Sequence, residues 1–169
     1  MAAVWGGGAL VSGPLRLGWD VVSGRRRRPI LMGVGIGGGV AAVFISGALL
    51  VREIDVIAEP IGRVLSYAGQ GHLGVLVVIT VINGVAEELF FRGALYSALG
   101  PTRPLLFSTV LYTVATSVSG NAGLGVAAVV LGTVCALERR ATGGVLAPVV
   151  THLVWGLAMP LVLPPLFAG

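Results

Sequence analysis

The chain has 169 residues, of which 56% are apolar and only 11% are charged, and its mean hydropathy is +0.97. A soluble domain carries about 25% charged residues, so this composition excludes a water-soluble protein and indicates an integral membrane protein. The formal net charge is +4, but no basic surface alternates with aromatic residues, which argues against a nucleic-acid partner.

Residues 1–29 are predicted to form a cytoplasmic N-terminal tail. The first 24 residues include three consecutive glycines at 6–8 and show no helical period, although the stretch 4–17 suits a membrane interface. Four arginines at 25–28 directly precede an apolar run, and a basic block in that place is typical of the cytoplasmic side of a membrane. That run is too long for a signal peptide, so we expect no cleavage.

Residues 30–169 are predicted to form one transmembrane helical domain, an all-α polytopic bundle with about five spans. The first span, Ile30–Val51, is an uninterrupted apolar run of 22 residues, enough to cross about 30 Å of hydrocarbon. The later apolar segments are 73–98, 104–119, 122–137 and 143–163. Turn-forming or charged residues at 100–101, 119–121 and 138–140 predict the breaks between them.

The arginines predict that the N-terminus lies inside and the C-terminus outside. With the 25–28 block on the cytoplasmic side, five crossings place Arg103 and Arg139-Arg140 on that side as well, and the 52–72 loop outside. The charges of that loop are Arg52, Glu53, Asp55, Glu59 and Arg63. An arginine-only composition rich in Gly, Ala and Val is typical of a high-GC bacterium, so we expect the bacterial cytoplasmic membrane.

The first span contains two pairs of small residues four positions apart, Gly33/Gly37 and Gly35/Gly39. Such pairs let two helices approach closely. We expect internal packing in preference to a dimer interface, and the sequence leaves the oligomeric state open.

The second span contains three charged residues, Glu87, Glu88 and Arg92. A carboxylate inside a membrane costs a few kcal/mol, so such residues usually face a polar cavity and mark function. Glu88 and Arg92 are four positions apart and can pair on one helix face. Glu87 points about 100° away without a partner in its own segment, which suits a general base. The alternative, a helix end reaching the headgroups, is opposed by the distance of Glu87 from the cytoplasmic break.

The last span contains His152, and a lone histidine in an apolar helix is often a packing residue. Its depth favours a functional role, because Glu88 and His152 both lie roughly 13–15 Å from the cytoplasmic end of their spans. Two ionisable residues at one depth predict one site. His72 belongs to the outer edge and is expected to lie about 20 Å from that site.

Two segments carry a resemblance to a known family. Residues 87–93, Glu-Glu-Leu-Phe-Phe-Arg-Gly, resemble the EExxxR-G motif of the CPBP family: the type II CAAX prenyl endopeptidases and bacterial bacteriocin-processing and immunity-like (Abi) relatives. Residues 139–152 are similar to the family's later motif, a basic-Thr-Gly stretch that leads into a helix with a buried histidine. The resemblance covers about 73–163 and implies peptide-bond hydrolysis in or beside the membrane.

The resemblance also implies roles for individual residues. Glu87 matches the glutamate that activates the attacking water, and Glu88 with Arg92 matches the pair that supports the site. His152 matches the later histidine, which either binds a metal or stabilises the tetrahedral oxyanion.

The chain departs from the family pattern at two positions. Thr116, four residues after Tyr112, stands where the family has a histidine, and Gly156 stands where an asparagine usually follows the late histidine. Tyr112, Thr116 and Asn121 are therefore candidate substitutes for the missing polar groups.

Zinc is the cofactor that the resemblance suggests, and its candidate ligands here are Glu88 and His152. Catalytic zinc normally has three protein ligands, and Glu87 completes that number only by giving up its role as the base. The single cysteine, Cys135, excludes a thiolate cluster. We therefore expect no tightly held zinc.

Three functions follow from these observations. The first is an intramembrane endopeptidase that cleaves a membrane-associated peptide or protein with a Glu-activated water. The alternative is a non-catalytic family member that acts as a membrane binding or immunity-type protein. The third is a small proton-coupled transporter subunit with Glu87 and His152 as a relay, which the absence of an inverted repeat opposes. Beyond the lipid bilayer, the sequence identifies no specific substrate or partner.

Overall fold

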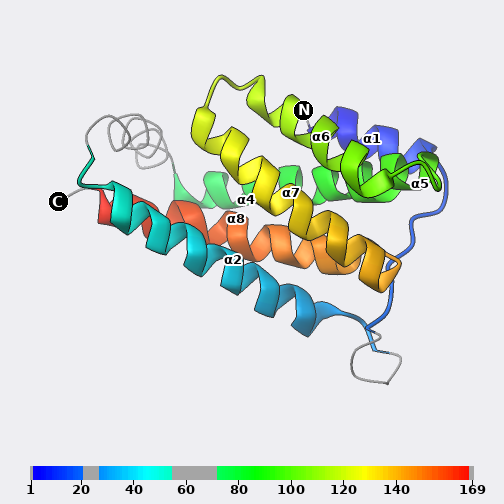
Figure 1. Cartoon of the computed structure of the whole chain (residues 1–169), viewed down its shortest axis with the longest axis horizontal. Coiled ribbons are helices and arrows are strands. Elements are labelled where there is room, and N and C mark those ends of the chain that lie inside the picture. Colours follow the sequence, from blue (N-terminus) through cyan, green and yellow to red (C-terminus); the bar gives the residue numbers. More distant parts are fainter. Residues whose placement is uncertain (1, 21–26, 55–71, 168–169) are drawn as a thin grey trace.

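The computed structural model describes residues 2–20, 27–54 and 72–167, and the elements it contains there are helices (Figure 1). Four helical segments are long and apolar enough to cross a membrane: α2 (Ile30–Val51), α7 (Ala122–Thr142), α8 (Leu146–Leu166) and the continuous run Gly74–Ala98. That run consists of α4 (Leu73–Glu88), the π-helical η1 (Leu89–Leu95) and α5 (Tyr96–Ala98). A fifth apolar helix, α6 (Pro104–Ser117), has 14 residues.

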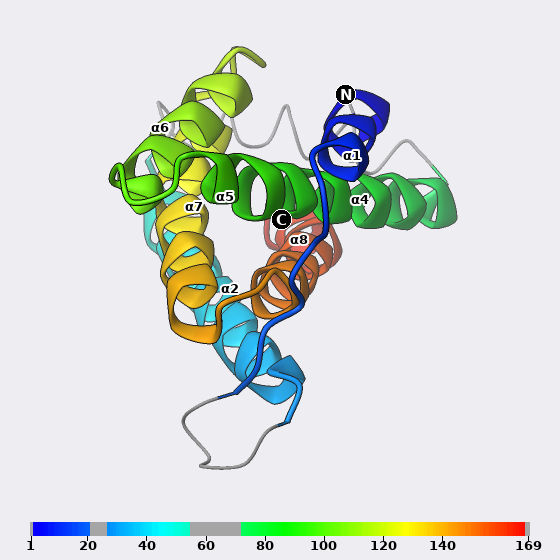
Figure 2. The ribbon, with the colours of Figure 1, turned by 90° about the vertical axis from the view of Figure 1, so that its right-hand side faces the viewer.

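These helices confirm the prediction of an all-α membrane bundle with about five spans, and the protein is an integral multi-pass membrane protein. Helix α2 packs along α8, and α6 packs along α7 (Figures 1 and 2). Helix α8, which carries His152, also contacts α4 and α7. Its position is therefore fixed from three sides.

Glycines of α2 make the contact with α8 close. A Cβ atom added at Gly33 would lie 2.8 Å from the Ala147 carbonyl oxygen, and one at Gly37 would lie 2.8 Å from the Thr151 carbonyl oxygen. At Gly35 and Gly39 an added Cβ would meet nothing within 4 Å. The predicted internal packing is confirmed for Gly33/Gly37, whereas Gly35/Gly39 face away from the bundle.

We expect Gly37→Ala to destabilise the protein, because the added methyl group must push the α8 backbone away. Overpacking of this kind typically costs about 1–3 kcal/mol. The matched control is Gly35→Ala on the same helix, which should be neutral or stabilising by up to ~1 kcal/mol, since Ala is the better helix former. Thermal unfolding in detergent micelles measures both variants, and equal melting temperatures would contradict the close α2–α8 contact.

Helix α7 is longer than predicted, because the expected break at 138–140 lies inside the helix. The helix ends instead at Gly143, which has φ +69° and donates its N–H to the Arg139 carbonyl. Glu138 and Arg139 are buried, with 2% and 8% of their surface exposed. Residues 138–140 do not break the helix, because the two buried side chains among them have polar partners on other segments. Glu138 contacts Thr151, and Arg139 donates to the Arg92 carbonyl.

The prediction that residues 1–24 lack a helix is wrong for α1 (Ala2–Val11). Its Trp5 ring lies 4.7 Å and 5.1 Å from the ring centres of Phe90 and Phe91. An added Cβ at Gly8 would lie 3.1 Å from Phe90, so a larger residue would crowd this contact. Three glycines lower the intrinsic helix propensity, and the helix forms because the bundle supplies tertiary contacts.

After α1 the chain crosses the α7–α8 connection (Figure 2). The Trp19 N–H donates to the Thr142 carbonyl at 2.9 Å, and the Val145 N–H donates to the Arg16 carbonyl at 2.8 Å. Arg28 lies over the Trp19 ring at 4.1 Å. The N-terminal segment is therefore packed on the bundle, at the end where α7 stops and α8 begins.

Several sequence predictions fall on residues outside the described ranges. These are the arginines at 25 and 26 and the loop charges Asp55, Glu59 and Arg63. At the described edge of that loop, Arg52 and Glu53 form an exposed ion pair at 2.9 Å. The topology with the N-terminus inside and the C-terminus outside stays a prediction.

Candidate functional site

The candidate site begins at the π-helical turn η1, which directly follows Glu88. A π-helix is wider than an α-helix and often occurs at functional sites, because it changes the hydrogen bonding of backbone carbonyls. Within η1 the Phe91 carbonyl accepts a hydrogen bond from Ser108 of α6 at 2.8 Å. The Arg92 carbonyl accepts one from Nε of Arg139 on α7 at 2.7 Å. These bonds attach α6 and α7 to the segment that carries the charged residues.

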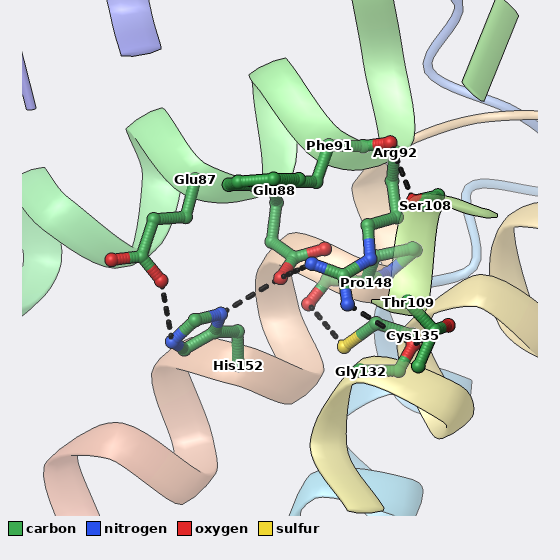
Figure 3. Close-up of polar contacts among 10 residues, drawn as sticks. All are labelled: Glu87, Glu88, Phe91, Arg92, Ser108, Thr109, Gly132, Cys135, Pro148 and His152. Carbon is green, nitrogen blue, oxygen red and sulfur yellow. Dashed lines mark hydrogen bonds and ion pairs between the residues drawn. The ribbon is translucent and has the colours of Figure 1, made fainter. Parts of the chain in front are cut away.

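Glu88 and Arg92 form a fully buried ion pair, as their spacing predicts. The Nη1 atom of Arg92 lies 2.9 Å from Oε1 of Glu88, and neither side chain is exposed. The Nη2 atom of Arg92 donates to the Gly132 carbonyl of α7 at 3.0 Å (Figure 3), and the guanidinium lies 4.4 Å from the Tyr112 ring centre. The pair therefore joins α4, η1 and α7, and these bonds offset the desolvation of two buried charges.

His152 reaches the same carboxylate from α8. Its Nδ1 lies 2.8 Å from Oε1 of Glu88 (Figure 3). A carboxylate held by Arg92 only accepts hydrogen bonds, so Nδ1 of His152 carries a proton, and when the ring is neutral its Nε2 is an acceptor. An added Cβ at Gly84 would lie 3.3 Å from Cδ2 of His152, which shows how closely α4 and α8 approach here.

Glu87 faces the other side of the imidazole. Its Oε2 lies 3.9 Å from Nε2 of His152, too far for a direct hydrogen bond (Figure 3). A water could lie between the two atoms, with hydrogen bonds of about 2.8 Å to each. The angle at its oxygen between these two bonds would be roughly 90°, close to the angle between the two O–H bonds of water. The Glu87 side chain is 25% exposed, whereas Glu88 is fully buried. The two acceptors can therefore orient a water by both of its protons.

The candidate substitutes for the missing polar groups are placed differently. Tyr112 is buried beside the site, with its ring centre 6.4 Å from that of His152 and 4.4 Å from the Arg92 guanidinium. Thr116 lies about one turn further along α6 and is half-buried. Of these two α6 residues, Tyr112 is the one that the structure places in contact with the charged residues.

Asn121 and His72 lie away from these residues. Asn121 caps α7, and its Oδ1 accepts hydrogen bonds from the N–H groups of residues 123 and 124. It is eleven residues, or roughly 16 Å, along α7 from Gly132. His72 is exposed before the start of α4, about 22 Å along the helix from Glu87.

Glu138 and Thr151 also belong to the polar interior, and the sequence reasoning missed them. Thr151 precedes His152, and its Oγ1 lies 2.8 Å from Oε1 of Glu138. In the structure, buried α7 residues recur at intervals of three and four, and Glu138 continues that series. The series is Ala128, Leu131, Cys135, Glu138 and Thr142.

The donor set does not fit a catalytic zinc ion. Oε1 of Glu88 is already bonded to Arg92 and to Nδ1 of His152. Nε2 of His152 and the Glu87 carboxylate remain as two facing groups that could bind a metal ion. The described part of the chain holds no group of three His, Cys, Asp or Glu side chains suited to a metal. Catalytic zinc normally has three protein ligands. We therefore derive no step through a metal.

Comparison with models of known protein families gives a match. The family model described as type II CAAX prenyl endopeptidase Rce1-like matches residues 69–158, more than half of the chain. The matched range contains Glu87, Glu88, Arg92, Tyr112 and His152. No curated protein and no solved structure matches the chain.

Proposed function

This chain belongs to the type II CAAX prenyl endopeptidase Rce1-like family, and we propose that it hydrolyses peptide bonds of membrane-associated substrates, with Glu87 activating the attacking water. The observation that carries this proposal is the position of Oε2 of Glu87, which faces Nε2 of His152 at 3.9 Å. The arginine distribution supports a bacterial cytoplasmic membrane with the N-terminus inside.

The proposed reaction balances with one water and one peptide bond. Glu87 and His152 hold the two protons of the water, which directs an oxygen lone pair at the scissile carbonyl carbon. As the new C–O bond forms, Glu87 takes a proton and a tetrahedral oxyanion develops. Glu87 then returns that proton to the leaving nitrogen as the C–N bond breaks, and the carboxylate is regenerated.

The neighbouring residues orient and stabilise these groups. Glu88 accepts from Nδ1 of His152, so it holds the imidazole with Nε2 turned toward Glu87. Arg92 keeps Glu88 in place through the buried ion pair. We propose the hydroxyl of Tyr112, which is buried beside His152, as the donor to the oxyanion.

The test is cleavage of a library of membrane-spanning peptides by the purified protein in lipid vesicles, with products identified by mass spectrometry. The proposal predicts cleavage by the wild type and none by Glu87→Gln. Absence of cleavage by a folded wild type, over several lipid compositions and with or without added zinc, would overturn it.

A non-catalytic, binding or immunity-type family member is the second candidate. Thr116 and Gly156 stand where the family pattern has histidine and asparagine, which favours this candidate. The Glu88–Arg92 pair also stabilises the fold without any reaction, since it joins the η1 segment to α7. In that case Glu87→Gln leaves every measurable function unchanged, whereas Arg92 substitutions still destabilise the protein.

We expect Gly84→Ala to lower peptide cleavage, because the added methyl group displaces the His152 ring by a few tenths of an ångström or more. Misplacing a catalytic group by about 1 Å can lower the rate about 10²-fold. The matched control on the same helix is Gly74→Ala, whose added Cβ meets nothing within 4 Å. Initial rates of cleavage in vesicles compare the two variants, and equal rates would contradict the role of this contact.

A further inference from the structure

Glu138 of α7 is a second buried carboxyl group in the bundle, and the proposed mechanism does not use it. Only 2% of the residue is exposed. Its Oε1 contacts the Thr151 hydroxyl at 2.8 Å, and its Oε2 is buried without a hydrogen-bond donor among the described residues. Cys135 lies one turn before Glu138 on the same face of α7. The charged groups that act on it are Glu88 and Arg92.

The hydrogen bonds around Thr151 require one more proton than a threonine supplies. Its Oγ1 lies 2.8 Å from Oε1 of Glu138 and 3.0 Å from the Gly33 carbonyl oxygen of α2. The hydroxyl carries one proton, and a carbonyl oxygen can only accept. If Thr151 donates to Gly33, then Glu138 must donate to Thr151. An ionised Glu138 would instead compete with the Gly33 carbonyl for that single proton, and the two contacts of the Thr151 hydroxyl could not both be full hydrogen bonds.

The charged groups near Glu138 also favour its protonated, neutral form. Arg92 is already paired with Glu88 at 2.9 Å and donates to the Gly132 carbonyl. Arg139, the next residue after Glu138, donates to the Arg92 carbonyl and to the Ser97 hydroxyl. An ionised Glu138 would therefore be a second buried carboxylate, and unlike Glu88 it would lack a cation of its own, an arrangement that proteins avoid inside a membrane.

We propose that Glu138 is a neutral carboxylic acid that donates through the Thr151 hydroxyl to the Gly33 carbonyl, and so positions His152. The chain of hydrogen bonds joins α7, α8 and α2 at the turn of α8 that carries the imidazole. It fixes the rotation of α8 at the residue before His152, and hence the contact of Nδ1 with Glu88. Glu138 is therefore a positioning residue. Its part in hydrolysis rests on the proposed function, whereas its protonation state is independent of that function.

Infrared spectroscopy of the full chain in lipid tests the protonation state. The difference spectrum between wild type and Glu138→Gln should contain the C=O stretching band of a protonated carboxylic acid. Thr151→Val, which removes the hydroxyl but keeps the shape, should shift that band, and Thr151→Ser should leave it in place. The control is Glu53→Gln, because Glu53 is exposed and paired with Arg52. A carboxylate band lost from folded Glu138→Gln would overturn the proposal.

The positioning role is tested by the ¹⁵N resonances of the His152 ring, with His72 as an internal reference. Glu138→Gln keeps a donor for Thr151 and should leave the His152 shifts and kcat close to wild type. Glu138→Leu should move the His152 shifts and lower kcat by up to about 10²-fold, with less change in KM. If Glu138→Leu does not fold, Thr151→Val gives the same comparison. Unchanged His152 shifts in the variants that remove the hydrogen bond would overturn the role, even if the wild type cleaves no peptide.

Discussion

Glu87→Gln is expected to abolish peptide cleavage while the protein stays folded. The amide has the size of the carboxyl group but cannot accept the proton of the water. General-base catalysis contributes about 10²–10⁴-fold to a rate, so kcat/KM should fall by at least that factor. The Glu87 side chain is 25% exposed and lies 3.9 Å from Nε2 of His152, too far for a direct hydrogen bond, so the melting temperature should change little.

The matched control is Glu53→Gln, the same change at an exposed glutamate outside the site. Cleavage rates of a membrane-spanning peptide in vesicles should be normal for the control and absent for Glu87→Gln. Full activity of Glu87→Gln would place the base elsewhere. A change in proton flux without any peptide product would instead support the transporter function that the sequence leaves open.

Arg92→Met is expected to produce the largest loss of stability among single substitutions of the charged residues. It leaves the fully buried Glu88 carboxylate without its cation and the Gly132 carbonyl without its Nη2 donor. Removing one partner of a buried ion pair costs about 3–5 kcal/mol. The matched control is Arg140→Met, because Arg140 is exposed on α7, and its effect should stay within about 0.5 kcal/mol.

The double variant Glu88→Gln/Arg92→Met distinguishes the lone charge from lost packing. Removing both charges avoids a buried unpaired carboxylate, so the double variant should be more stable than Arg92→Met alone. The Glu88→Gln side chain retains a carbonyl oxygen that accepts from Nδ1 of His152. Thermal unfolding in micelles measures the two variants against the wild type. A double variant as unstable as the single one would assign the loss to packing of the guanidinium against Tyr112.

Much of the helical architecture could be predicted from the sequence, because helix length and spacing are local properties. The bounds of Ile30–Val51 agree with the structure, since an uninterrupted apolar run of that length leaves few alternatives in a membrane. The pairing of Glu88 with Arg92 follows from the helical repeat. The common depth of Glu88 and His152 follows from the rise per residue, and their Oε1 and Nδ1 atoms are 2.8 Å apart.

Other features depended on contacts between residues far apart in the chain. Helix α1 has three glycines, and its Trp5 packs against Phe90 and Phe91, 85 or more residues away. Asn121 has a side chain suited to a site, yet it caps α7.

The sequence by itself therefore determined the membrane class, the spans and the Glu88–Arg92 pair, which all follow from composition and helical periodicity. Only the tertiary structure decided that α7 continues through 138–140 and that Glu138 is buried. Whether a charged side chain near a helix end reaches water or the interior depends on its partners, and those of Glu138 lie on α8. Local sequence patterns do not contain that information, because the favourable energy arises only when the helices pack.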